Sequence, residues 1–322
     1  MIAAIVHGDL DGLVSAAILS SYMRNKNKRV KIYTTQPYLL PQALLRLQNL
    51  RNLESLFIID LGLDVHTWNR IKYLIRTFSK FTKVIWIDHH IATLKLAMEL
   101  LDFNVSLIFS IDRCASTATY YMFGKGTEDP IFFAKLAKVG EISDKVVVED
   151  VDNELKEITE KLILALSENP SDDVFKLDLI KLWVINHKFL DDEVEIRASI
   201  ASKRLRELRK IAQNNMVYQS ENAIIIDFRT VNAIGYIGLL ASQLADEFKK
   251  NTFIVFTSQN ELVVTFRAPT SASVDLSDKL MEIARKYGGS GGGHPRAFSI
   301  RIPITLGQNI IDELIEQFRA KQ

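Results

Sequence analysis

The chain of 322 residues has a formal net charge of +1, and 48% of its residues are hydrophobic. This length predicts two domains with ordinary cores, and the near-zero charge excludes a protein that holds nucleic acid mainly through a broad basic surface. No run approaches the roughly 20 apolar residues of a membrane span, the N-terminus meets acids too early for a secretory signal, and the single Cys114 excludes an internal disulfide. We therefore expect a cytoplasmic protein with no membrane partner, whose oligomeric state the sequence leaves open.

The first 140 residues alternate short β-rich runs with longer amphipathic ones, which is typical of βα units around a parallel sheet. The predicted strands span residues 2–7, 29–35, 55–61, 83–88 and 105–110. The predicted helices span about 11–25, 41–51, 66–80, 93–101, 115–124 and 129–140. This pattern predicts an α/β domain over residues 1–150.

The chain then becomes mostly helical and charged, and its last part, 191–215, has the apolar spacing of one long helix. A second β-rich pattern follows. Its predicted strands span 222–229, 252–258, 261–268 and 297–304, with helices at about 235–250, 275–287 and 309–320. We expect a helical connector over 151–218 and a smaller α/β domain over 219–322. The low-complexity stretch GGSGGGH occupies 288–294.

Acids and histidines follow the predicted strands of the first domain, where ligands of a parallel sheet gather. Together with an acid after helix 129–140, they are His7, Asp9, Asp11, Asp60, Asp88, His89, His90 and Asp144. Converging carboxylates cannot all stay ionised without a counter-charge, and an oxygen-rich site with imidazole and no thiolate suits Mn(II) or Mg(II). Two such ions can bind both the attacking and the leaving oxygen of a phosphoryl displacement. The pattern therefore predicts phosphoester hydrolysis.

Two of these motifs also have a structural interpretation. Asp9 and Asp11 are residues that cap helix N-termini, and a helix begins near Gly12. The glycine run at 288–294 has the composition of a flexible loop. Packing seldom explains the pair His89 and His90, because adjacent side chains of a strand point to opposite faces.

The motifs HGDLDG, IID, IDHH, VGEISD and GGGHPRA, in this order, resemble those of the DHH phosphoesterase superfamily and its associated C-terminal domain. The resemblance covers nearly the whole chain and is closest to the RecJ-like nuclease and oligoribonuclease branch of archaeal type. It implies a parallel-sheet DHH domain joined by helices to a smaller α/β substrate-binding domain. The implied cofactors are two Mn(II) ions, with Mg(II) as an alternative.

The resemblance assigns a role to each matched residue. The implied metal ligands are His7, Asp9, Asp11, Asp60, His89 and Asp144. Asp60 would bridge the ions, Asp9 and His7 would hold one, and the remaining ligands the other. Asp88 and His90 would be catalytic, orienting ligands or contacting the scissile phosphate. His7 stands two residues before Asp9, whereas several branches place this histidine four residues before.

The C-terminal motif implies a substrate site. Arg267 would bind a phosphate through its two-pronged guanidinium. The implied partners of the same anion are Gly291, Gly292, Gly293 and His294. The motif usually ends in Ala-Gly, and Phe298-Ser299 stands there in this chain.

The implied function is a Mn/Mg-dependent exonuclease that hydrolyses single-stranded DNA or RNA from an end, with a replication or repair protein as a further partner. One alternative is an oligoribonuclease or cyclic-dinucleotide phosphodiesterase that acts on very short substrates. Another, of a different class, is a non-catalytic replisome scaffold related to the same family. Such a scaffold is expected to have lost metal ligands, whereas this chain has all the matched acids.

Overall fold

The computed structural model describes residues 1–48, 50, 52–63, 67–144, 152–258 and 260–319. The chain folds into two compact units, Met1–Ser199 and Ile200–Gln322. The expected boundary at residue 150 lies outside the described residues, and the division into 1–150, 151–218 and 219–322 stays a prediction. No helix in the described ranges combines the length and the apolar character needed to cross a membrane.

The N-terminal unit is built on a five-stranded sheet. Its strands are β1 (Ile2–His7), β2 (Val30–Thr35), β3 (Ser55–Ile59), β4 (Lys83–Asp88) and β5 (Ser106–Phe109). They pair in the order β2-β1-β3-β4-β5, and each pairing is parallel. The structure confirms the predicted α/β class and parallel sheet.

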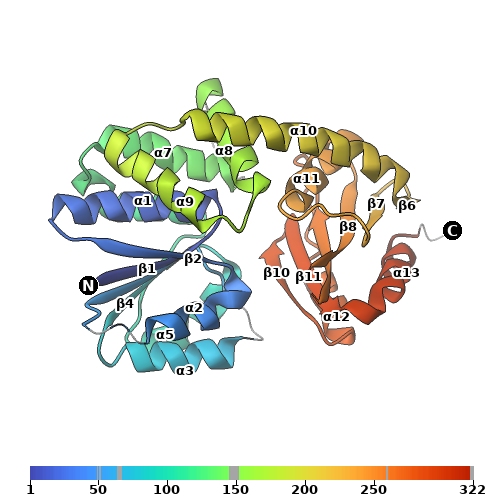
Figure 1. Cartoon of the computed structure of the whole chain (residues 1–322). Helices are drawn as coiled ribbons and strands as arrows, with labels where there is room; N and C mark the ends of the chain where they lie inside the picture. Colours follow the sequence, from blue (N-terminus) through green and yellow to red (C-terminus); the bar gives the residue numbers. More distant parts are fainter. Residues whose placement is uncertain (49, 51, 64–66, 145–151, 259, 320–322) are drawn as a thin grey trace. The chain divides into compact units, whose positions relative to one another are not determined.

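Helices cover both faces of this sheet, with α1, α7, α8 and α9 on one side and α2, α3 and α5 on the other (Figure 1). The bounds are α1 (Leu10–Asn25), α2 (Leu40–Leu47), α3 (Trp68–Phe78), α4 (Ile91–Lys95), α5 (Ala97–Asp102), α6 (Ala115–Phe123), α7 (Pro130–Ser143), α8 (Asn153–Glu168), α9 (Asp173–Lys181) and α10 (Asp192–Asn214). The single helix predicted over 93–101 is two short helices, and no helix-breaking residue type marks the break at Leu96.

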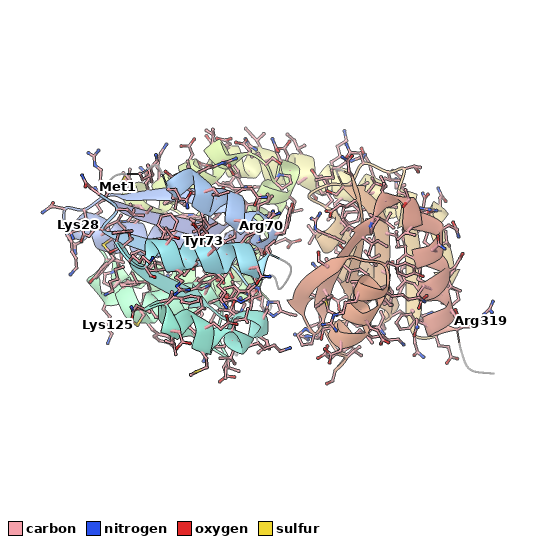
Figure 2. All side chains as sticks on the ribbon, turned by 90° about the horizontal axis from the view of Figure 1, so that it is seen from below. Met1, Lys28, Arg70, Tyr73, Lys125 and Arg319 are labelled. Carbon is pink, nitrogen blue, oxygen red and sulfur yellow. The ribbon has the colours of Figure 1, made fainter. Side chains whose placement is uncertain are left out.

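Strand alternation explains the two cores of this unit. Ile2, Ala4 and Val6 of β1 pack into the core that α1, α6 and α7 share with α8 and α9. Ala3 and Ile5 face the opposite core, which α2 and α3 close. Because a parallel strand is covered on both faces, it reads as a continuous apolar run. Figure 2 shows α3 from its outer side, with the exposed Arg70 and Tyr73 turned away from the sheet.

The C-terminal unit contains a six-stranded mixed sheet of order β10-β11-β9-β8-β7-β6. Its elements are β6 (Met216–Gln219), β7 (Ala223–Phe228), α11 (Ile237–Phe248), β8 (Asn251–Ser258), β9 (Glu261–Arg267), α12 (Ser277–Lys286), β10 (Ser290–His294), β11 (Ala297–Pro303) and α13 (Gly307–Phe318). Among the described strands of this sheet, only β7 and β8 pair in parallel. α12 and α13 close a core over one face of the sheet.

The glycine run departs from its predicted form. Residues 290–294 make the edge strand β10, which pairs antiparallel with β11. Glycine has little strand propensity of its own, so pairing with β11 rather than local preference imposes the extended conformation. A Cβ on Gly293 would stand 2.3 Å from the Ala297 carbonyl oxygen, and its φ of +141° suits glycine. The short strand β6 was also not predicted.

Candidate functional site

The carboxyl ends of β1 and β3 form the switch point of the parallel sheet. β1 lies between β2 and β3, and the helices that follow β1 and β3 pack into opposite cores. The chain segments after these two strands therefore diverge and leave room for a ligand, as in other sheets of this order. His7–Asp9 and Asp60 lie at these strand ends.

His7 and Asp9 form one side of the site. His7 Nδ1 lies 2.8 Å from Asp9 Oδ2 and 3.6 Å from Asp60 Oδ2. Its other nitrogen, Nε2, lies 3.1 Å from Gln36 Oε1. Burial lowers the pKa of His7, but the carboxylates of Asp9 and Asp60 outweigh it and raise that pKa well above its usual value. Asp9 also caps α1, because its Oδ1 accepts a hydrogen bond from Gly12 N, so both interpretations of HGDLDG apply.

Asp60 is a strained and crowded carboxylate. It is 2% exposed, and its φ of +59° lies in the left-handed region that non-glycine residues rarely adopt. Within the described residues its buried Oδ2 accepts no hydrogen bond. Burial, followed by the charges of Asp9 and Asp11, raises its pKa well above the usual value. A bound cation would offset the repulsion between the acids and give Oδ2 a partner.

Asp88 organises the residues after β4. Its Oδ1 accepts from His89 N at 2.9 Å and lies 2.7 Å from His90 Nδ1, while Thr93 Oγ1 donates to its Oδ2. Burial opposes ionisation of Asp88, but the charge of His90 lowers the pKa of Asp88 below its usual value. Asp88 in turn raises the pKa of His90 against the effect of burial. This fully buried carboxylate therefore fixes the orientation and charge of His90.

His89 connects Asp60 to Asp144. Its Nε2 lies 3.3 Å from Asp60 Oδ1 and its Nδ1 lies 3.5 Å from Asp144 Oδ2. Asp144 is the C-cap residue of α7. Burial and the nearby charge of Asp11 raise the pKa of Asp144 to about 8. The acid that follows α7 thus joins those that follow the strands.

Among the described residues of the N-terminal unit alone, two groups of candidate ligand atoms each lie within 4.8 Å of one another. One group consists of His7, Asp9 and Asp60, and the other of Asp60, Asp88, His89 and His90. Asp60 belongs to both, with Oδ2 toward His7 and Oδ1 toward His89. One buried carboxylate therefore stands between two sets of oxygen and imidazole donors, as a bridge between two metal ions requires.

Asp11 differs from the other acids because both its oxygens accept backbone hydrogen bonds. Ala115 N donates to Oδ2 at 2.8 Å and Ser116 N donates to Oδ1 at 2.9 Å. Asp11 thus caps the N-terminus of α6 from 104 residues away, an interaction that the positive end of the helix favours. A Cβ on Gly140 would stand 2.9 Å from Asp11 Oδ1 and 2.1 Å from Ser116 Oγ, so a glycine lets α7 pack here. Each oxygen of Asp11 keeps a second lone pair, and its role as a metal ligand stays a prediction.

In the C-terminal unit, Arg267 ends β9 beside α11. Its Nη1 donates to the Phe266 carbonyl at 2.8 Å, and its Nη2 lies 2.9 Å from the point that a Cβ on Gly238 would occupy. Burial lowers the pKa of Arg267 to about 10, which leaves it charged at neutral pH. Within the described residues it forms no ion pair, whereas Arg229 and Arg301 are paired with Asp227 and Glu261.

The glycine run lies on the edge strand β10, and β11 separates it from β9, which carries Arg267. Ala297 of β11 is opposite His294 of β10 on one side and opposite Arg267 on the other. Gly292 is exposed, and a Cβ there would meet nothing within 4 Å. By contrast, a Cβ on Gly291 would stand 2.9 Å from the Ser299 carbonyl oxygen. β10 therefore needs glycine at residue 291, where a side chain would collide with β11, whereas the space beside Gly292 is open.

Residues 223–320 match the family model of the DHHA1 domain. The C-terminal unit thus resembles the DHHA1 domain over these residues. No curated protein matches the chain in sequence.

Solved structures share the fold over nearly the whole chain. A DHH-domain structure of a member of the s1p family of ribosomal proteins has a TM-score of 0.73 at 15% identity, covering 98% of this chain and 86% of that one. A pGpG-specific phosphodiesterase, PggH from Vibrio cholrae, has a TM-score of 0.62 at 14% identity over 100% of both chains. The exonuclease RecJ bound to manganese has a TM-score of 0.57 at 15% identity, covering 100% of this chain and 90% of that one.

These matches confirm the resemblance to the DHH superfamily in the fold and in its associated domain, while the archaeal type stays a prediction. The fold places His7, Asp9, Asp60, His89 and Asp144 in contact with one another through the distances given above. It places Arg267 on β9 and the glycine run on β10, the two strands that flank β11 in the mixed sheet. The roles of these residues remain proposals.

The sequence prediction missed side chains that support the candidate site of the N-terminal unit. Gln36 contacts His7 directly after β2 ends, and Thr93 anchors Asp88 one turn after the histidine pair. Glu141 is 1% exposed and holds Arg113 and Lys138 at 3.1 and 2.6 Å. Gln36 was detectable because it follows a strand of the same sheet, whereas Glu141 carries no such signal.

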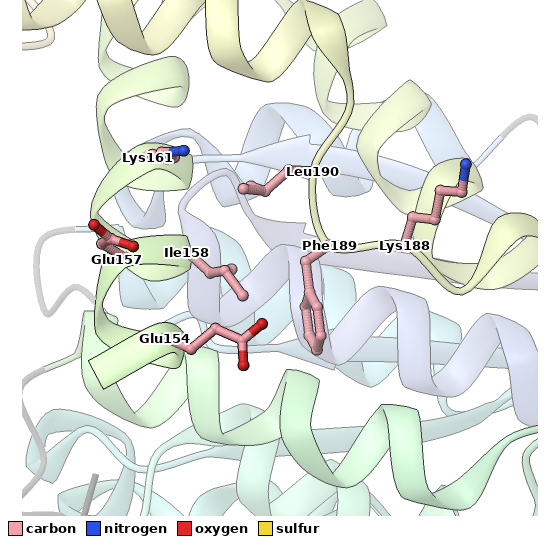
Figure 3. Close-up of a pocket in the computed structure, with 7 residues that line it drawn as sticks. All are labelled: Glu154, Glu157, Ile158, Lys161, Lys188, Phe189 and Leu190. Carbon is pink, nitrogen blue, oxygen red and sulfur yellow. The ribbon is translucent and has the colours of Figure 1, made fainter. Parts of the chain in front are cut away.

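A cavity of about 400 Å³ lies elsewhere in the N-terminal unit, between α8 and the loop 188–190 (Figure 3). Its lining residues are Glu154, Glu157, Ile158, Lys161, Lys188, Phe189 and Leu190. Charges of both signs and three apolar side chains share this wall, and Lys161 is already paired with Glu195. None of the acids at the strand ends contributes to it, so we assign the cavity no part in the site.

Proposed function

We propose that the chain is a divalent-metal-dependent phosphodiesterase, and that it acts as an exonuclease on single-stranded nucleic acid. The observation that carries the proposal is the position of Asp60, a buried carboxylate shared by two clusters of ligand atoms. A structural role does not account for an acid that is strained, crowded by other acids and lacking a hydrogen bond to one oxygen within the described residues.

The donor set fits two hard or borderline divalent ions. His7 and Asp9 would hold one ion and His89, Asp11 and Asp144 the other, with Asp60 shared. Carboxylate oxygens with imidazole and no thiolate favour Mn(II) or Mg(II). When bound, such ions supply positive charge to the phosphate and lower the pKa of a bound water.

The protein's own residues would orient the phosphate. Asp88 occupies Nδ1 of His90, so Nε2 is the nitrogen with which His90 can donate a hydrogen bond to a phosphate oxygen. The raised pKa of His90 favours the imidazolium, whose hydrogen bond to an anion is charge-assisted. Thr93 and Asp88 hold this histidine in place during the reaction.

The DHHA1 domain would bind the substrate through Arg267 and the strand of Gly291, Gly292, Gly293 and His294. Arg267 is charged and unpaired with any carboxylate among the described residues, so a phosphate would complete its interactions. The exposed Gly292 on an edge strand leaves room for an anion to approach the backbone.

The second candidate is a phosphodiesterase for very short substrates, either an oligoribonuclease or a cyclic-dinucleotide phosphodiesterase. It is supported by the structural match to PggH, which is pGpG-specific and is covered over its whole length. The complete set of acids argues against a non-catalytic replisome scaffold. Single-stranded DNA or RNA as substrate, a replication or repair partner and a cytoplasmic location remain expectations.

Product analysis distinguishes these functions. End-labelled RNA and DNA of two to thirty nucleotides are incubated with the protein in Mn(II) or Mg(II), with an Asp60→Asn variant as the control for contaminating nucleases. An exonuclease yields mononucleotides from a twenty-mer, whereas the second candidate cleaves dinucleotides much faster than twenty-mers. Rapid cleavage of a closed single-stranded circle contradicts end recognition, and no hydrolysis of any linear substrate in either metal contradicts both enzymes.

A further inference from the structure

A buried lysine from α9 reaches the carboxyl edge of the parallel sheet. The Lys176 side chain is only 6% exposed. Its Nζ lies 3.1 Å from the point that a Cβ on Gly8 would occupy, and Gly8 stands between His7 and Asp9. Because consecutive Cα atoms are about 3.8 Å apart, the ammonium lies within roughly 9 Å of the Asp9 Cα.

The ammonium is held in this position from the neighbouring strand. Lys176 Nζ donates to Asp173 Oδ1 at 3.0 Å, and the same oxygen accepts from Thr34 Oγ1 of β2 at 2.5 Å. An ammonium has three N–H donors, and Asp173 is its one hydrogen-bond partner among the described residues. The geometry leaves two donors for another acceptor.

The Gln36 amide lies on the same side of Gly8. Gln36 Nε2 is 3.8 Å from the point that marks the missing Cβ of Gly8, while Gln36 Oε1 contacts His7 Nε2. Two groups that donate hydrogen bonds therefore flank a glycine at the β2 side of the site. A side chain at residue 8 would fill the space that they share.

An ion pair alone does not explain the burial of Lys176. The Asp173 side chain is 64% exposed, so the acid remains in water while the lysine is buried. On the same helix, Lys181 and Asp178 form an equivalent (i, i+3) pair with the lysine 67% exposed. Burying a charge is costly unless it is matched by partners, and an anionic ligand would supply the missing partner.

We propose that Lys176, assisted by Gln36, binds a substrate phosphate that neighbours the scissile one, on the β2 side of the metal centre. This inference rests on the proposed phosphodiesterase function, because it places the scissile phosphate at Asp60. The ligand is the phosphate of the adjacent nucleotide or of a chain end. Lys176 is a substrate-positioning residue and does not take part in bond cleavage.

The test compares three substrates that share one scissile linkage: a dinucleoside monophosphate, the same molecule with a 5′-phosphate, and the same molecule with a 3′-phosphate. For the wild-type protein we expect one added phosphate to lower KM by roughly tenfold, the value of one hydrogen bond to a charged group. Lys176→Gln should abolish this advantage by raising KM for the phosphorylated substrate, with little change in kcat for that substrate. Lys176→Arg should retain part of it, and the matched control Lys181→Gln should retain all of it.

The result overturns the inference if neither added phosphate lowers KM in the wild type, or if Lys176→Gln keeps the full advantage. If no diester is hydrolysed, the proposed function fails, and binding of the same three molecules in the presence of EDTA decides the inference separately. Should Lys176→Gln unfold, Asp173→Ala replaces it, because alanine removes the acceptor that orients the ammonium and leaves the buried side chain of Lys176 in place.

Discussion

The two sheets of this protein present opposite charges at their candidate sites. At the carboxyl edge of the parallel sheet, acids crowd together until the pKa values of Asp60 and Asp144 rise. On the mixed sheet of the C-terminal unit, Arg267 is buried without a carboxylate partner among the described residues. A cation would offset the crowded acids of the first sheet and an anion would pair with Arg267 of the second, in agreement with the proposed phosphodiesterase function.

The largest effect is expected from Asp60→Asn. Asparagine tolerates a positive φ better than alanine does, so this change removes the charge and keeps the backbone. We expect kcat to fall by roughly 1,000-fold or more at saturating Mn(II), since the shared ligand is lost. Steady-state kinetics check this, and near-normal turnover would show that the acidic edge of the sheet is not a metal centre.

Arg267→Met tests the candidate anion site on the mixed sheet. The loss of a charged phosphate ligand should raise KM roughly 30-fold with little change in kcat. Arg301→Gln is the matched control, because Arg301 lies on the same sheet but is paired with Glu261. A fall in kcat with KM unchanged would mean that Arg267 belongs to the reaction centre instead.

Asp11→Ala tests whether Asp11 stabilises the fold as a helix cap or destabilises it through repulsion from the neighbouring acids. Its two bonds to the N-terminus of α6 predict a loss of about 2 kcal/mol in the free energy of unfolding. Urea unfolding in EDTA measures this. Increased stability would show that repulsion from neighbouring acids outweighs the cap.

Asp144→Asn is expected to give the smallest effect, and it should stabilise the metal-free protein, whereas Asp11→Ala should destabilise it. Because the folded-state pKa of Asp144 is raised to about 8, ionisation costs stability progressively as pH rises from about 4 to 8. In EDTA the variant should therefore match the wild type at pH 4 and unfold roughly 2–4 °C higher at pH 8.5, as about 1 kcal/mol would give. Equal stability at both pH values would contradict crowding of the acids.

Local pattern accounts for much of the N-terminal site. Strands 2–7 and 83–88 were predicted with the bounds that the structure has, because continuous apolar runs mark strands covered on both faces. Parallel strands end at a common edge, so the acids after them were expected to converge. The contact of Asp60 with His7 and His89 follows from that rule.

By itself, the sequence determined which acids and histidines follow the strands of the parallel sheet, because strand period and residue type are local properties. Only the tertiary structure decided that Asp11 caps α6 across 104 residues, that Lys176 is buried beside Gly8, and that the glycine run becomes strand β10. These features depend on pairing and packing between segments far apart in the chain. Local propensity does not encode such contacts, and for the glycine run it favours a different structure.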